Sequence, residues 1–499
     1  MLTDLYQITM AYAYWKTNRH THSAVFEVFF RKNPFGGEYT IFCGLDEVLK
    51  FLANFRFSPS DLDFLRQTPA LKDCDPEFFD EYLTNLDCSE VSVEAVQEGS
   101  LVFPRMPLLV ISGPLGITQL LETTILTLVN FPSLVATNAA RMVVAANSSY
   151  GNEGSAFLRK VPKCVEFGLR RAQGVDGGFS ASKYCIIGGF DASSNVLAGK
   201  LLGIPISGTH AHAFVQSHSS LDDCRGLKLK PKGSSEEIEL LDIVLKYREE
   251  FGNGWSNTND GELAAFVAYA VSFPETFLCL IDTYDVLRSG LRNFIMVALS
   301  LNDCGYIPKG VRLDSGDLSF FSLEASKEFS EIADRFDRPF MRELDIVASN
   351  DINENVLHSL NKQGHGITIF GIGTNLVTCQ AQPALGCVYK LVQINDKPRM
   401  KLSQDIEKVL IPGRKVAYRL FGKSGLPLLD LLVGKDNNDE IPIVGSSILC
   451  RHPFIEQKRC LVRPTIVKKL HTIVFDKENG VVIELPNIHE TKQVSQKNE

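Results

Sequence analysis

The chain has 499 residues, 44% of them hydrophobic and 22% charged, which suits about two or three globular domains. Its net charge is −8, with acidic and basic residues mixed along most of the chain. A nucleic-acid-binding surface needs a clustered basic excess, so we expect no nucleic-acid partner. The 12 cysteines include no CxxC pair, which argues against a structural zinc site and favours reduced, buried thiols.

The N-terminal segment does not have the pattern of a secretory signal, because Asp4 comes early and no basic residues precede an apolar run. The longest apolar runs, such as 108–110 and 294–299, are far shorter than the roughly 20 residues that a membrane helix needs. We therefore expect a soluble, cytosolic protein that makes no membrane contact.

In chain order, the first part (1–109) combines helical segments with an extended aromatic segment at 26–30 and short strands within 91–110. We expect it to be an α+β part. The last part (391–499) is rich in basic and β-branched segments, and we expect it to be β-rich with a frayed polar end at 489–499.

Between these parts, residues 110–390 alternate short apolar runs with stretches of helical periodicity. Such alternation favours parallel strands joined by helices. We interpret this part as an irregular, incomplete α/β barrel, with an exposed insertion at 143–163. The expected strands are 185–190, 204–207, 276–281, 310–313, 345–348 and 367–370, and the expected helices are 193–202, 286–301, 322–336 and 352–363.

Polar or glycine residues directly follow or close most of these strands. In barrel-like α/β folds the active site lies at the carboxyl ends of the strands, so we expect these residues to meet there. They are His212, Asp282, Arg312, Asp314, Asn350 and the segment Gly371–Thr374.

Two strand-end segments offer groups for an anion. Gly371-Ile372-Gly373-Thr374-Asn375 could cradle a phosphate with backbone N–H groups, although a plain tight turn explains it equally well. Arg312 offers a planar, bidentate partner for a carboxylate or phosphate. Asp314 and Asp317 could hold Mg²⁺ or sugar hydroxyls, but for Asp317 we favour a cap on the next helix.

Two further segments remain open on the residues alone. His210 and His212 could be zinc ligands if a third ligand lay nearby, and His212 is either a nucleophile or a structural histidine. Phe167 precedes Arg170 and Arg171, a combination that suits stacking on a heteroaromatic acid while neutralising its charge. A surface helix start with solvated arginines explains the same residues.

Six segments together resemble the nicotinate phosphoribosyltransferases of the eukaryotic type, which are similar to type II phosphoribosyltransferases. They occur in order along most of the chain, so an accidental resemblance is excluded in practice. The segments are LTDLYQITMAYAYW (2–15), EFGLRRAQGVDGG (166–178), SNVLAG (194–199), GTHAH (208–212), VRLDSGDL (311–318) and FGIGTN (370–375).

The resemblance implies an irregular α/β barrel with a second domain built from both chain ends, working as a homodimer. It implies transfer of a phosphoribosyl group from phosphoribosyl pyrophosphate to nicotinate in NAD synthesis, with ATP as co-substrate and Mg²⁺ or Mn²⁺ as cofactor. His212 would be phosphorylated from ATP, and Arg312 would hold the nicotinate carboxylate. The nicotinate site would also include Thr209, Phe167, Arg170 and, from the neighbouring subunit, Tyr6; Thr374, Gly373 and Asp314 would bind phosphoribosyl pyrophosphate.

Asn195 has two interpretations. Nicotinamide-using relatives look similar here but carry an aspartate, so Asn195 could select the acid by removing a repelling charge. It could equally be only a helix N-cap. The rival functions are a nicotinamide- or quinolinate-using enzyme on the same fold, a Schiff-base enzyme that would need a strand-end lysine, and a catalytically inactive interaction protein.

Overall fold

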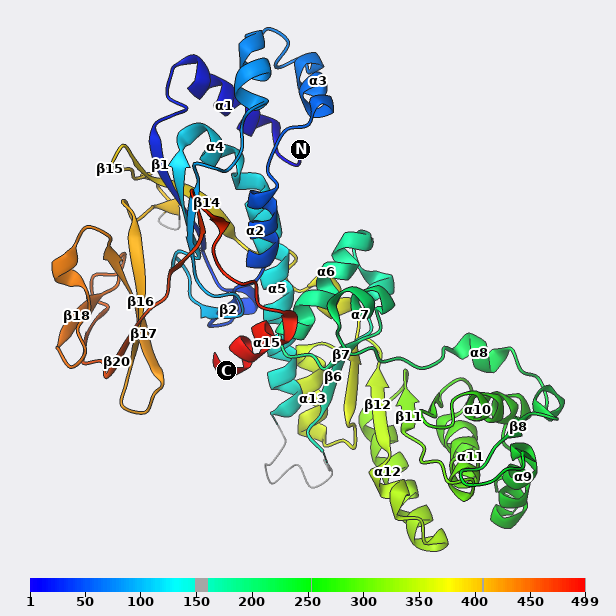
Figure 1. Cartoon of the computed structure of the whole chain (residues 1–499). Helices are drawn as coiled ribbons and strands as arrows, with labels where there is room; N and C mark the ends of the chain where they lie inside the picture. Colours follow the sequence, from blue (N-terminus) through cyan, green and yellow to red (C-terminus); the bar gives the residue numbers. More distant parts are fainter. Residues whose placement is uncertain (149–159, 253, 406–407, 499) are drawn as a thin grey trace. The chain divides into compact units, whose positions relative to one another are not determined.

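The computed structural model describes residues 1–148, 160–252, 254–405 and 408–498 (Figure 1). The chain forms two compact units: residues 1–137 with 381–499, and residues 138–380. A unit built from both chain ends, together with an α/β unit, is the fold class that the sequence predicts.

The boundaries expected at 109/110 and 390/391 differ from this division. Strands β5 (Leu109–Pro114) and β14 (Cys387–Ile394) both pair with β1 (Ser23–Phe30), so they belong to the sheet of the first unit. The alternation of strands and helices could not show this, because it does not reveal which strands share a sheet.

The main sheet of the first unit has seven strands in the order β15-β14-β1-β5-β3-β21-β22. The central strand β1 has the sequence SAVFEVFF, and all but its first residue are buried, as expected for a strand covered on both faces. Its pairs with β5 and β14 are antiparallel. The other strands are β3 (Ser92–Ala95), β15 (Lys397–Pro398), β21 (Thr472–Asp476) and β22 (Gly480–Val481).

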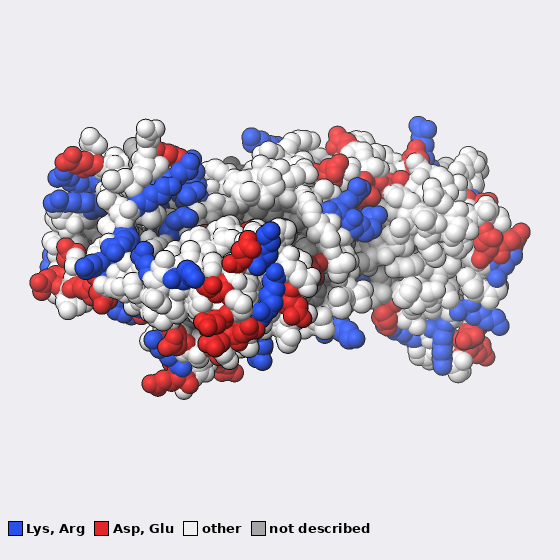
Figure 2. Space-filling view, turned by 90° about the horizontal axis from the view of Figure 1, so that it is seen from above, with Lys and Arg blue, Asp and Glu red and all other residues white. Residues whose placement is uncertain are grey.

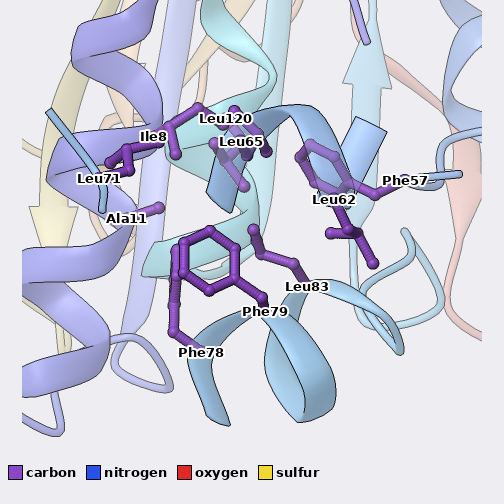
Figure 3. Packing of buried hydrophobic residues seen from close by; sticks show 10 residues of the cluster. All are labelled: Ile8, Ala11, Phe57, Leu62, Leu65, Leu71, Phe78, Phe79, Leu83 and Leu120. Carbon is purple, nitrogen blue, oxygen red and sulfur yellow. The ribbon is translucent and has the colours of Figure 1, made fainter. Parts of the chain in front are cut away.

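A separate apolar cluster holds the N-terminal helices of this unit together (Figure 3). Helix α1 (Leu5–Lys16) contributes Ile8 and Ala11, and α3 (Pro59–Gln67) contributes Leu62 and Leu65. All of these side chains are buried. Figure 3 shows them turned toward one another with Phe57, Leu71, Phe78, Phe79, Leu83 and Leu120.

The C-terminal part is β-rich, as predicted. It adds a three-stranded sheet, β17-β16-β20, and the hairpin β18-β19. The expected frayed end is wrong, because residues 488–498 form helix α15 (Ile488–Asn498), in which Thr491 and Ser495 are buried. The strands are β16 (Lys415–Phe421), β17 (Pro427–Gly434), β18 (Ile448–Arg451), β19 (Arg459–Val462) and β20 (Ile466–Lys469).

One helix, α5 (Glu122–Asn147), is long and apolar enough to cross a membrane by length and composition. Its most apolar window is 67% buried inside the protein, as in the core helix of a soluble protein. The first five residues of the insertion expected at 143–163 continue this helix, and residues 149–159 lie outside the described part of the chain.

The second unit contains a six-stranded parallel sheet in the order β10-β11-β12-β13-β6-β7. A parallel bridge from Ser193 to Ile206 extends its β7 edge. No pairing between β10 and β7 occurs in the described residues, so the barrel is open, as the sequence predicts. The strands are β6 (Lys163–Glu166), β7 (Ala192–Ser193), β10 (Leu278–Leu280), β11 (Gly310–Leu313), β12 (Asp345–Ser349) and β13 (Ile369–Ile372).

The strand expected at 185–190 is wrong, because α6 (Gly174–Ile187) extends to Ile187. Residues 181–187 are all buried, and an apolar run in a fully buried helix has the same composition as a buried strand. The strand expected at 204–207 is only the Ile206 bridge.

The four expected helices are all present around this sheet, whereas the helices at 212–216, 240–251 and 260–272 were not predicted. Helix α12 packs on β11 and β12 and on α13, and Figure 1 shows this group side by side. The helices are α7 (Val196–Leu202), α8 (His212–Gln216), α9 (Leu240–Phe251), α10 (Asp260–Ser272), α11 (Leu291–Asp303), α12 (Leu318–Phe336), α13 (Glu354–Gln363) and α14 (Thr374–Thr378).

Candidate active site

The candidate site lies at the carboxyl edge of the parallel sheet in the second unit. Because the strands are parallel, their last residues share one edge, where ligands bind in open α/β folds. The chain leaves this edge at Asp282, Asp314, Asn350, Gly373, Phe167 and Asn195.

Arg312 lies on β11 beside the ring of Phe167, which follows β6. Its guanidinium carbon is 5.2 Å from the ring centre, within cation–π distance. Nε of Arg312 donates to Oγ of Ser349 at 2.9 Å, and Nη2 donates to Oδ1 of Asp314 at 3.2 Å. Ser349 also donates to Asp314. The guanidinium is therefore held in one orientation beside an aromatic face.

His212 begins α8 and lies near two carboxylates. Its Nδ1 is 3.1 Å from Oγ1 of Thr283, and its Nε2 is 4.0 Å from Oδ1 of Asp282 and 3.8 Å from Oδ2 of Asp314. The imidazole is 39% exposed, so Nε2 can meet a substrate. A nucleophilic role suits this position better than a structural one.

Asp282 has one oxygen in use and one without a hydrogen-bond partner. Oδ2 accepts from the backbone N–H of Asp314 at 3.1 Å and from Ser315. Oδ1 is buried and has no partner, which is costly for a carboxylate unless a ligand or ion completes it. Among the described residues no group of three or more His, Cys, Asp or Glu side chains could hold a metal by itself.

His210 is structural, in contrast to His212. Its side chain is buried, and its Nε2 accepts from the backbone N–H of Leu280 at 3.3 Å. Burial lowers the pKa of His210 to about 4, so the ring is neutral at physiological pH. The zinc interpretation of the histidine pair does not fit, because the backbone of β10 takes this nitrogen.

The turn after β13 packs closely on the turn after β6. A Cβ on Gly371 would lie 2.4 Å from the Phe167 ring, and a Cβ on Gly168 would lie 2.7 Å from the carbonyl oxygen of Gly373. Only glycine allows this approach. The predicted phosphate segment, with Gly373 and Thr374 at the start of α14, therefore lies next to Phe167.

Two smaller predictions can be placed as well. Asp317 caps α12 through Oδ1, which accepts from the N–H of Phe320 at 3.0 Å, so the capping interpretation is confirmed. Thr209 is half-buried in the segment between the Ile206 bridge and His210, where its hydroxyl donates to the His210 carbonyl at 3.3 Å.

Asn195 is an N-cap, and both ends of its side chain are used inside the protein. Oδ1 accepts from the N–H groups of Leu197 at 3.1 Å and Ala198 at 3.3 Å, and Nδ2 donates to Oγ of Ser182 at 3.1 Å. The residue is 4% exposed. The capping interpretation of Asn195 is therefore confirmed, and both polar atoms of its side chain belong to a buried hydrogen-bond network.

Arg170 has no contact with the Arg312 cluster in the described part of the chain, and the predicted role of Tyr6 belongs to a neighbouring subunit. Arg170 is exposed in a short 3-10 helix, Leu169–Arg171. Tyr6 belongs to the first unit, where it is 48% exposed on α1. Burial and the neighbouring carboxylate of Glu122 raise the pKa of Tyr6, so its phenol stays protonated.

Four further residues take part in the site without having been assigned a role from the sequence: Asp282, Thr283, Ser349 and Glu166. Asp282 follows a predicted strand, and Ser349 follows the predicted strand end at Ala348, so position at the edge was the available signal. Glu166 carries no such signal, because a charged residue that closes a strand is ordinarily exposed.

Comparison with known proteins gives the same assignment along the chain. Residues 162–422 match the nicotinate phosphoribosyltransferase (NAPRTase) family, residues 1–130 its N-terminal domain and residues 414–498 its C-terminal domain. The nicotinate phosphoribosyltransferases of Dictyostelium discoideum and Caenorhabditis elegans are each 51% identical over 99% of this chain, which covers 81% and 86% of their lengths.

A solved structure agrees with this result. The human nicotinic acid phosphoribosyltransferase superposes with a TM-score of 0.86 at 42% identity, over 100% of this chain and 93% of that one. With matching family models and relatives at this identity over nearly the whole length, the chain belongs to the nicotinate phosphoribosyltransferase family.

Proposed function

We propose that this protein joins nicotinate to 5-phosphoribosyl 1-pyrophosphate, forming nicotinate mononucleotide and pyrophosphate. This is the first step of NAD synthesis from nicotinate, and it is coupled to ATP hydrolysis. The observation that carries the proposal is the Arg312 guanidinium beside the Phe167 ring. A flat aromatic acid needs both a stacking face and a bidentate cation for its carboxylate.

In the proposed reaction the pyridine nitrogen attacks C1 of the ribose. The new N–C1 bond forms as the bond from C1 to the pyrophosphate oxygen breaks, and pyrophosphate leaves with the electron pair. The pyridine nitrogen carries no proton, so no protein base is needed. Arg312 would hold the carboxylate, and Gly373 with Thr374 would hold the 5-phosphate. Fixing both substrates in line can contribute roughly 7–11 kcal/mol through orientation.

The edge suits a divalent cation bound with the pyrophosphate. Magnesium sites of this kind use one or two carboxylates and complete the shell with phosphate oxygens and water. Asp282 has a buried oxygen without a partner, and its Oδ1 and the Asp314 Oδ2 both lie within 4.0 Å of His212 Nε2. When bound, Mg²⁺ or Mn²⁺ supplies Lewis-acid stabilisation of the leaving pyrophosphate.

His212 is the proposed site of phosphorylation by ATP. In the tautomer whose Nδ1 proton is donated to Thr283, Nε2 carries the free electron pair and lies 4.0 Å from Asp282 and 3.8 Å from Asp314. Nε2 would form a bond to the γ-phosphorus while the bond from that phosphorus to the bridging oxygen breaks, releasing ADP. The carboxylates of Asp282 and Asp314 lie near Nε2 and would repel a phosphate group. A bound cation would offset this repulsion.

The proposed assembly is a cytosolic homodimer in which Tyr6 reaches the nicotinate site of the neighbouring subunit. The half-exposed ring of Tyr6 supports this role, since a ring on the surface is available to a second chain. On the face shown in Figure 2, basic and acidic side chains are interspersed, which supports small-molecule substrates over nucleic acid.

One assay tests the function. The purified protein is given phosphoribosyl pyrophosphate with nicotinate, nicotinamide or quinolinate, with and without ATP and Mg²⁺. Of the three pyridine substrates, we expect only nicotinate to give rapid mononucleotide formation, and we expect ATP to increase that rate. Preferred use of nicotinamide or quinolinate would instead support the rival enzymes of the same fold, and no turnover with any of them would overturn the proposal.

A further inference from the structure

Glu166, the last residue of β6, carries a buried carboxylate at the base of the proposed pyridine site. Its side chain is 0% exposed. Oε1 accepts from the backbone N–H of Gly168, and Oε2 accepts from Oγ of Ser182 at 2.9 Å and Oγ of Ser193 at 2.5 Å. Such a carboxylate persists in a core only when hydrogen bonds replace its water.

The donors to Glu166 come from separate segments, so the carboxylate ties them together. Gly168 is in the turn after β6, Ser182 is on α6 and Ser193 ends β7. Asn195 extends the network, because its Nδ2 donates to Ser182 at 3.1 Å and its backbone N–H donates to Ser193 at 3.0 Å. The turn, two helices and two strands are thus joined around one negative charge.

This network fixes the backbone on both sides of Phe167. The N–H of Phe167 donates to the carbonyl of Ile372 at 2.8 Å, and the next N–H, of Gly168, donates to Glu166. Because both amides are held, the backbone of the turn directs the Phe167 ring toward the Arg312 guanidinium and Gly371.

We propose that Glu166 is a positioning residue of the pyridine site: it holds the Phe167–Gly168 turn so that the ring forms a fixed stacking face for the acid. The proposal rests on the proposed function for its substrate. It also gives Asn195 a specific part. The Ser182 hydroxyl has one proton, which is within reach of Glu166 at 2.9 Å and of the Gly178 carbonyl at 3.1 Å, while Asn195 donates to its oxygen, so the network accommodates one carboxylate and one amide.

The pairing leads to a charge-exchange experiment. Glu166→Gln removes the only charge, and Asn195→Asp adds a second one two hydrogen bonds away. In the double variant Glu166→Gln with Asn195→Asp, the charge and the amide change places. The amide at position 166 can donate to Ser182 and Ser182 can donate to the carboxylate at position 195, so only the Ser193 hydroxyl loses its acceptor. We expect each single change to raise the KM for nicotinate by roughly tenfold, the scale of one hydrogen bond to a charged group. The KM for phosphoribosyl pyrophosphate should change far less.

The double variant should recover part of the loss, with a nicotinate KM below that of either single variant. A merely structural role would raise both KM values together. Glu262→Gln is the matched control, because Glu262 is likewise 0% exposed and accepts from a serine and an asparagine, Ser289 and Asn293. We expect it to leave the nicotinate KM unchanged.

A double variant no better than the worse single one, or equal rises in both KM values, would overturn the positioning role. Failure of the proposed function is seen separately, as a parent protein that does not use nicotinate. In that case thermal unfolding still tests the coupling between Glu166 and Asn195. Both single variants should have melting temperatures below that of the parent, and the double variant should have a melting temperature above those of the single variants. Loss of stability that adds up in the double variant would contradict it.

Discussion

The Arg312 guanidinium and the Phe167 ring lie 5.2 Å apart, although 145 positions separate them in the chain. The same guanidinium donates through two different nitrogens, to Ser349 and to Asp314. Lysine keeps the charge but cannot make this planar set of contacts. We expect Arg312→Lys to lower kcat/KM for nicotinate by roughly 1.5–3 kcal/mol, measured by steady-state kinetics.

A matched control for this change is Arg335→Lys. Arg335 also has its guanidinium over aromatic rings, 4.8 Å from that of Phe251, but on α12 and away from the strand ends. Its replacement should leave nicotinate kinetics as in the parent. Unchanged kinetics in Arg312→Lys itself would remove Arg312 from the pocket.

His212→Ala should abolish the stimulation of turnover by ATP while a slow, ATP-independent transfer persists. Phosphorylation needs the imidazole nitrogen, whereas attack of pyridine on C1 does not. The measurement is the rate of mononucleotide formation with and without ATP, together with the intact mass of the protein after incubation with ATP. His358→Ala, at an exposed histidine on α13, serves as control. Full stimulation in the His212 variant would refute the assignment.

Gly371→Ala should impair nicotinate use without unfolding the protein. The added Cβ would lie 2.4 Å from the Phe167 ring, and the ring can move away, so the expected effect is a displaced stacking face. We expect a rise in the nicotinate KM with an almost unchanged melting temperature. In Gly177→Ala the new Cβ has no neighbour nearer than 4.0 Å, so that variant should retain the parent's kinetics. A parental KM in Gly371→Ala would show that the ring is not part of the site.

Tyr6→Ala and Arg312→Ala should each be inactive alone if Tyr6 completes the site of a second subunit. Mixed under conditions that exchange subunits, they should form heterodimers in which one site retains both residues. Native mass spectrometry checks the exchange, and turnover of the mixture checks the complementation. Confirmed exchange with no recovered activity would rule out a shared site.

The pH dependence of stability should contain a contribution from Glu262. Burial, and then the carboxylates of Asp282 and Asp285, raise its pKa from 4.5 to about 7. A raised pKa means that the stability contribution is complete below the unfolded value and is lost as pH rises from about 4.5 through 7. At 1.36 kcal/mol per unit, the loss is about 3 kcal/mol.

Glu262→Gln removes this titration. The free energy of unfolding, measured with urea at about pH 5 and about pH 8, should therefore rise in the variant relative to the parent as pH rises. The expected difference is on the order of the same 3 kcal/mol. Curves for the two proteins that stay parallel between these pH values would show that Glu262 does not titrate in the folded state.

Much of the site was predictable because parallel strands all present their carboxyl ends at one edge. A short apolar run and the polar residue at its end are both local features, and they placed Arg312, Asp314 and Gly373 at this edge without any knowledge of strand order. The same local reasoning placed the Asp317 cap, since a cap depends only on its own helix.

Local patterns failed where the answer depended on what surrounds a segment. The run at 185–190 is a helix end because α6 is buried along its whole C-terminal half, and burial is not encoded in a short window. The boundaries expected for the central part differ from those of the two compact units because β5 and β14 pair with β1, across about 80 and 360 positions of chain.

The sequence by itself determined the family, the α/β class and the edge at which the chemistry is expected, because motifs and strand ends are local. Only the tertiary structure decided which of two neighbouring residues of the same type is buried in the core and which is available to a substrate. His210 is turned into the core and His212 toward solvent, although they are two positions apart. Asn195 caps a helix and completes the Glu166 network because α6 brings Ser182 to it, a contact between segments that no spacing along the chain specifies.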